Sequence, residues 1–94
     1  MDIRYTDRSK IDVSIAFNGY EKQKNGLGYD FLISIEDSIE KIIRNPKLYP
    51  VWHSNFHRCI IRRFPFSIYY SIEEEFIIIH SVFNNRLHPS KMPK

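Results

Sequence analysis

The sequence has few of the features that mark several classes of protein. It contains one cysteine, Cys59, so no internal disulfide can form and nothing indicates secretion. Three glycines and five prolines are too few for a low-complexity or fibrous chain. No apolar run approaches the roughly 20 residues of a membrane-spanning helix, and the first ten residues lack the apolar core of a signal peptide. We therefore expect a soluble, cytoplasmic protein without a membrane partner.

The chain also has only a small excess of positive charge. The 14 Lys and Arg residues against 11 Asp and Glu give a net charge of +3. Residues 1–47 carry eight of each sign, and residues 48–94 carry six basic against three acidic residues, so the excess lies in the second half. A basic half can attract nucleic acid or an acidic protein. However, +3 is also an ordinary solubility charge for a small domain. Composition alone favours this simpler interpretation, with no charged partner implied.

Apolar side chains are abundant: 43% of the residues are hydrophobic and 15% are aromatic. This is a globular composition, and 94 residues suffice for one domain with a modest core. We expect a single domain over residues 1–94, with a polar tail from about residue 84.

Hydrophobic periodicity predicts most of the elements. Residues 2–6 fit an edge strand, and Thr6 or Asp7 is a suitable cap for a following helix. Residues 27–46 predict a helix that ends at Asn45-Pro46, followed by a loop. Strands are predicted over 57–64, 67–73 and 75–83, the last two joined in a hairpin by a turn at 73–75.

The stretch "SKIDVSIAFNGYEKQKNG" (9–26) is ambiguous. Its apolar residues alternate as in a strand, and Asn18-Gly19 is a strong hairpin turn signal. However, Val13, Phe17 and Tyr20 also form a stripe with helical spacing. Periodicity alone does not decide between the two structures.

The predicted hairpin strands are apolar on both faces, which is typical of strands covered on both sides. One or two helices cover only one face of a four-stranded sheet. The other face would expose apolar side chains to solvent or to a partner: Tyr69, Ile77, Ile79 and Phe83. Alternatively, Tyr5, Trp52 and the tail close this face.

Two long segments carry a resemblance to a known family. "GLGYDFLISIEDSIEKIIRNPKLYP" and "RRFPFSIYYSIEEEFIIIHSVFNNRLHP" resemble the RelE/ParE family of bacterial type II toxins, and "RFPFSIYY" is similar to its ParE-like branch, the plasmid stabilisation proteins. The resemblance implies an α+β fold: a strand, a two-helix hairpin and a three-stranded antiparallel meander (β-α-α-β-β-β). It therefore implies that residues 8–24 are helical.

The resemblance also implies a function. Such toxins arrest growth by acting on translation or on DNA topology, and a cognate antitoxin, often partly disordered and acidic, neutralises them. Folding of an antitoxin segment onto the second face of the sheet would bury Tyr69, Ile77, Ile79 and Phe83. A homodimer and a toxin–antitoxin hetero-oligomer both remain open.

The resemblance leaves the target open between two mechanisms. In a RelE-like ribosome-dependent mRNA endonuclease, Arg58, Arg62 and Arg86 would be the catalytic residues, and Arg63 would complete a basic surface with them. The chain departs from that pattern, because Ser67, Asn84 and Leu87 stand where nuclease members carry arginine, histidine and a second arginine. A ParE-like inhibitor of DNA gyrase needs no such set, so we favour it. A third alternative is an inactive relic that only binds its antitoxin.

We expect no metal ion and no cofactor. His53 and His57 have i, i+4 spacing but lie in a loop-to-strand region without a third ligand. Cys59 is best interpreted as a small core residue, because no histidine is placed to activate it.

Overall fold

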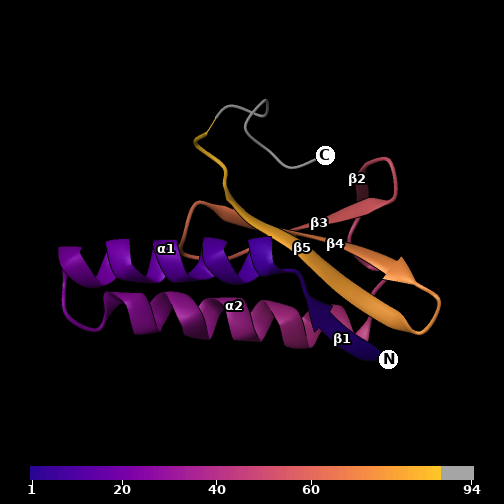
Figure 1. Ribbon diagram of the computed structural model, residues 1–94, viewed down its shortest axis with the longest axis horizontal. Coiled ribbons are helices and arrows are strands. Elements are labelled where there is room, and N and C mark those ends of the chain that lie inside the picture. Colours follow the sequence, from indigo (N-terminus) through magenta and orange to yellow (C-terminus); the bar gives the residue numbers. More distant parts are fainter. Residues whose placement is uncertain (88–94) are drawn as a thin grey trace.

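A computed structural model describes residues 1–87 of the chain, so residues 88–94 of the predicted polar tail lie outside the described residues. The elements, in chain order, are β1 (Asp2–Tyr5), α1 (Asp7–Gln23), α2 (Leu27–Arg44), β2 (Val51–His53), β3 (Phe56–Ile60), β4 (Phe66–Glu73) and β5 (Phe76–Asn84). Figure 1 shows the two helices side by side and packed against one face of the sheet. The predicted α+β class is confirmed.

The strands form one five-stranded sheet in the order β1-β5-β4-β3-β2. β1 pairs in parallel with β5, and the other neighbours are antiparallel. The predicted β-α-α-β-β-β order omitted β2, which lies in the segment expected to be a loop. β2 is three residues long and exposed, and it pairs with β3 through an irregular register, so it has no alternating pattern that a sequence could reveal.

The strand predicted over 57–64 ends earlier than expected. β3 stops at Ile60, and Arg63 takes a left-handed conformation with φ of 73°. That conformation is incompatible with an extended strand. Ile61 and Phe64 are nevertheless buried in the core, which explains why their apolar character resembled a continuing strand.

The ambiguous stretch is helical, as the family resemblance implied. Thr6 caps α1, since its side chain accepts a hydrogen bond from the amide of Ser9. Val13, Ala16 and Tyr20 pack against the core. The alternating residues Ile11 and Ile15 are instead 55% and 66% exposed, so the strand-like period has no structural counterpart.

The core lies between the helices and one face of the sheet. It contains side chains from α2, β4 and β5: Phe31, Ile35 and Ile42; Ile68 and Tyr70; Ile77, Ile79 and Val82. Ile77 and Ile79 were expected on the opposite face, and that placement was wrong. Tyr69 and Tyr70 pair with Ser81 and Ile79, so His80 is an extra residue in β5. This bulge interrupts the alternation and puts Ile77, Ile79 and Val82 on the helix side together.

Candidate functional site

The second face of the sheet, opposite the helices, carries a polar cluster that spans three segments. The Arg58 Nε atom on β3 donates to the Ser67 hydroxyl on β4 at 3.2 Å. The Ser67 hydroxyl donates to Asn85 Oδ1 at 2.7 Å, just after β5, and Arg58 Nη2 approaches the same oxygen at 3.4 Å. We call Arg58, Ser67 and Asn85 the arginine cluster. It fixes one guanidinium on the sheet with the hydrogen-bonding capacity to hold an anion.

Tyr69 lies beside the arginine cluster and is covered by an aromatic side chain. Its ring centroid is 5.2 Å from that of Trp52 on β2, in an edge-on arrangement. Burial raises the pKa of Tyr69, and the positive charge of Arg58 opposes the shift more weakly. Its phenol is therefore protonated at neutral pH and can donate a hydrogen bond.

The four side chains expected to be exposed on the second face are all buried. Tyr69 and Phe83 are 5% and 6% exposed, while Ile77 and Ile79 are at most 1% exposed and belong to the helix-side core. Tyr69 and Phe83 stand outside that core cluster, in agreement with a position on the second face. The expectation of four solvent-facing side chains was wrong, and whether any of them contacts an antitoxin stays a prediction.

The four predicted arginines have different partners in the structure. Arg58 lies in the arginine cluster, whereas Arg62 and Arg63 line a cleft beside α2. Arg63 also forms an ion pair with Asp30 of α2 at 3.6 Å. Arg86 follows β5, and its charge acts on the phenol of Tyr20 in α1. The four arginines thus have three different surroundings, although the strand pairing places all of them near the end of the sheet where β3 and β5 stop.

The second face also holds a histidine in the bulge of β5. His80 Nε2 lies 2.7 Å from the Ser71 hydroxyl, and Phe56 stands edge-on to the imidazole with centroids 4.8 Å apart. Burial lowers the pKa of His80, and the nearby charge of Glu73 opposes this shift. The ring is therefore neutral at pH 7. The sequence did not single out His80 as a functional residue. Its hydrogen bond to Ser71 and its position in a bulge could not be predicted, because no pattern in the sequence marks them.

His57 and Cys59, considered from the sequence as a metal ligand and a nucleophile, are both engaged in contacts within the fold. His57 stacks on Tyr70 with ring centroids 5.1 Å apart, and its Nδ1 atom lies 2.7 Å from the Tyr49 carbonyl oxygen. Cys59 is 1% exposed. Burial raises the pKa of its thiol, and hydrogen bonds with Tyr49 and Ser38 oppose the shift. Within residues 1–87, no group of three or more His, Cys, Asp and Glu side chains gathers as a metal site would require.

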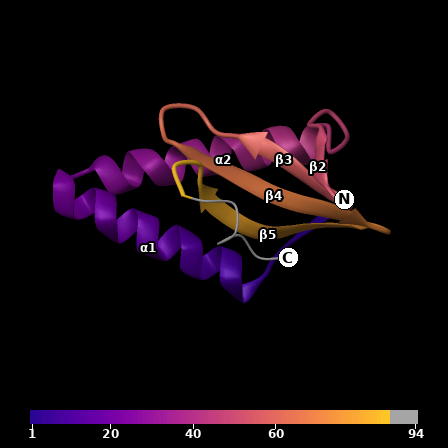
Figure 2. The same ribbon diagram turned by 90° about the horizontal axis from the view of Figure 1, so that it is seen from above.

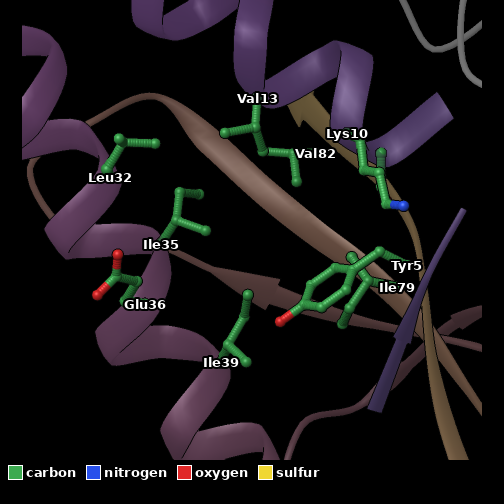
Figure 3. Close-up of a pocket in the computed structure, with 10 residues that line it drawn as sticks. Tyr5, Lys10, Val13, Leu32, Ile35, Glu36, Ile39, Ile79 and Val82 are labelled. Carbon is green, nitrogen blue, oxygen red and sulfur yellow. The ribbon is translucent and has the colours of Figure 1, made fainter. Parts of the chain in front are cut away.

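Residues of the helices line two cavities in the described part of the chain. The first, about 320 Å³, is an apolar groove between α1 and α2 with β5 at its floor, and Figure 3 shows Val13, Leu32 and Ile35 pointing into it. Burial raises the pKa of Tyr5 at its end, and Glu36 adds to the shift. The second, about 550 Å³, lies between α2 and the end of β3 and is mixed in polarity. Sequence reasoning identified neither cavity, because each depends on how the helices pack on the sheet.

Comparison with known proteins gives a result for structure only. No family model and no curated protein matches the sequence. Among solved structures, a chain of the "Chromosomal ParDE TA system from P. aeruginosa" superimposes with a TM-score of 0.68 and 16% identity. The match covers 89% of this chain and 95% of that one. The two chains share a fold.

This fold is the RelE/ParE-like arrangement that the resemblance implied, with β2 added to the sheet. Over residues 1–87, neither helix is long and apolar enough to cross a membrane. The arrangement leaves one sheet face and one cleft with unassigned roles: the face that carries the arginine cluster, and the cleft beside β3.

Proposed function

We propose that the chain is the toxin component of a bacterial type II toxin–antitoxin system, a growth inhibitor that a cognate antitoxin neutralises in the cytoplasm. One observation carries the proposal: the fold is shared, over 89% of this chain and 95% of the other, with a chain of a ParDE toxin–antitoxin system. The resemblance of "RFPFSIYY" to the ParE-like branch supports the same assignment.

Within that class we favour a ParE-like inhibitor of DNA gyrase over a RelE-like nuclease. RNA cleavage needs cations on the phosphate and a group that removes a proton. Arg58 stands with two neutral side chains, Ser67 and Asn85, while Arg62 lines the cleft beside α2 and Arg86 follows Asn85 in the chain. His57 and His80 are held by Tyr49 and Ser71. A binding inhibitor requires surface complementarity and none of this machinery.

The nuclease remains the second candidate because of the arginine cluster. A fixed guanidinium beside the phenol of Tyr69 is a plausible phosphate-binding pair, since both donate hydrogen bonds. In that case Arg58 would bind the phosphate. An antitoxin-binding relic is the remaining alternative, and it differs from both in lacking toxicity.

The test is induction of the protein in bacterial cells, with mapping of new mRNA 5′ ends and a supercoiling assay using purified gyrase. We expect growth arrest, inhibited supercoiling and no new cuts inside codons. Ribosome-dependent cuts that disappear in Arg58→Ala would replace the gyrase proposal with the nuclease. Absence of both arrest and cuts, with soluble protein present, would leave only the relic.

For the antitoxin we propose contact with the second face of the sheet, at Tyr69 and Phe83. Ile77 and Ile79, predicted as contacts of the same antitoxin, lie in the core and would support that face from beneath. An acidic antitoxin segment would also complement the net positive charge of residues 48–94.

A further inference from the structure

The larger cavity follows the outer edge of β3. It has a volume of about 550 Å³, and α2 forms its opposite wall. Its lining residues come from α2, the loop before β2, the end of β3 and the loop that follows: Ile33, Ser34, Asp37, Ser38, Lys41, Tyr49, Cys59, Ile60, Arg62 and Arg63. Figure 2 shows α2 running past the end of β3, while β2 lies toward the other end of that strand. We call this cavity the edge cleft.

The end of β3 has an unpaired backbone edge in the edge cleft. β2 pairs only with Phe56 and His57, and the carbonyl of Pro50 accepts the amide of Arg58 at 3.0 Å. On the inner side, the Ile61 amide donates to the Phe66 carbonyl of the β4 side at 3.1 Å. Since successive amides of a strand point to opposite sides, the N–H and C=O groups of Ile60 point outward. Within residues 1–87, neither group has a backbone partner.

The side chains beside this edge are apolar and exposed. Ile60 on β3 is 62% exposed, and Ile33 on α2, across the cleft, is 56% exposed. Natural sheets normally protect a free edge with charges, proline or a covering segment. Here two isoleucines flank the edge, so a chain lying in the cleft would gain both backbone hydrogen bonds and apolar contacts.

The charge of the edge cleft is positive. Lys41, Arg62 and Arg63 line it against a single lining carboxylate, Asp37. Arg63 is partly engaged by Asp30 at 3.6 Å, with its side chain 63% exposed. Lys41 and Arg62 have no ion-pair partner among the described residues. An occupant with carboxylates would therefore be complementary to this cleft.

We propose that the edge cleft binds an extended acidic peptide segment by β-strand addition next to Ile60. The peptide would pair its backbone with Ile60, direct apolar side chains toward Ile33 and Ile60, and direct carboxylates toward Lys41 and Arg62. A nucleic acid could use the cations but offers no strand to pair with the backbone edge. The identity of the partner as the antitoxin rests on the proposed function; the binding mode does not.

The probe is a labelled nine-residue peptide that alternates valine and glutamate, added to the purified full chain. We expect saturable binding, with slower hydrogen exchange at the Ile60 amide by about tenfold or more in the complex. The matched control peptide replaces glutamate by lysine and should not bind. Binding without protection of the Ile60 amide would overturn the proposal, as would equal binding of the lysine peptide.

Variants test the backbone pairing and the charge complementarity separately. Ile60→Pro removes the outward N–H without breaking a ladder bond and should abolish binding. Lys41→Glu and Arg62→Glu should each weaken binding roughly tenfold, whereas Arg44→Glu, exposed on the same helix outside the cleft, should leave it unchanged. Unchanged binding in Lys41→Glu and Arg62→Glu would overturn the charge assignment even if Ile60→Pro fails to fold. Displacement of the peptide by single-stranded RNA with protection of the same residues would indicate a nucleic-acid site instead.

Failure of this proposal and failure of the proposed function give different results. Growth arrest together with no peptide binding would overturn the edge cleft alone. Edge-specific peptide binding without growth arrest or an effect on gyrase or mRNA would overturn the toxin function and leave the peptide site.

Discussion

At the scale of single residues, Gly28 is a position where the two helices approach each other closely. A Cβ atom placed on it would lie 2.7 Å from the Phe17 carbonyl oxygen and 2.8 Å from Phe17 Cδ1. Its amide also donates to Glu21 Oε1 at 2.8 Å. Because backbone and ring atoms of α1 block the space, any side chain at residue 28 must push the helices apart.

We expect Gly28→Ala to lower the free energy of unfolding by about 1–3 kcal/mol, as overpacking does. Urea unfolding of the wild type and the variant measures this loss of stability. Gly19→Ala is the matched control, since Gly19 lies exposed in α1 with open space around its Cβ position. There alanine should raise the free energy of unfolding by about 0.5–1 kcal/mol through helix propensity. Equal effects at both glycines would contradict the close approach.

The burial of His80 predicts that the free energy of unfolding depends on pH. Burial lowers its folded pKa below the ordinary 6.5, so the unfolded chain binds a proton at higher pH than the folded protein does. The stability that neutral His80 contributes is complete above pH 6.5 and is lost as the pH falls through the lowered folded pKa.

Urea unfolding at pH 7.5 and 5.5 checks this expectation. The wild type should lose more stability over this interval than His80→Gln does. The prediction fails if His80→Gln and the wild type lose the same amount.

Residue-scale features were the least predictable from the sequence. The bulge at His80 reversed the placement of Ile77 and Ile79, because alternation holds only while the register is unbroken. Asn85 was not predicted as a member of the arginine cluster. It contacts Arg58, 27 residues away in the sequence, and no local pattern encodes such a contact. Ser67 was noticed only as a departure from the family pattern.

At the scale of elements, Asp12 joins α1 to β5. Its Oδ2 atom accepts hydrogen bonds from the Ser81 hydroxyl at 3.0 Å and the Val82 amide at 3.1 Å, directly after the bulge. Its other oxygen accepts from Arg8 Nε at 3.0 Å. The carboxylate therefore satisfies polar groups that the bulge releases from the ladder.

Asp12→Ala should lower the free energy of unfolding by about 1–3 kcal/mol, because the buried hydroxyl of Ser81 and the amide of Val82 lose their acceptor. Chemical denaturation measures the loss. The control is Asp37→Ala on the exposed side of α2, where we expect a change within about 0.5 kcal/mol. A loss at Asp12 no larger than at Asp37 would show that the tether contributes nothing.

Elements with strong local signals were predicted well. Helix α2 has a clear apolar face and a proline stop, and the β4–β5 hairpin has long apolar strands around three glutamates. The helix α1 required the family resemblance, since its own pattern fits a strand equally well. β2 was missed because three exposed residues, paired irregularly, carry no periodicity.

At the scale of the whole molecule, the fold was predictable and the sites were not. A modest core was expected from length and composition, but the α+β arrangement required the family resemblance, because periodicity left residues 9–26 undecided. The surroundings of Arg58, Arg62, Arg63 and Arg86 depend on strand ends and turns, which the sequence pattern does not locate. The ParDE-like fold persists at 16% identity, which is consistent with a core defined by apolar pattern more than by particular side chains.

The measurement that tests the toxin proposal most directly is the count of viable bacteria after induction of the chain. The control is Ile77→Asp, which places an unpaired carboxylate in the core and should prevent folding. We expect the wild type to stop growth and the control to leave it unaffected. Normal growth while soluble, folded wild-type protein accumulates would contradict the assignment of this chain as a toxin.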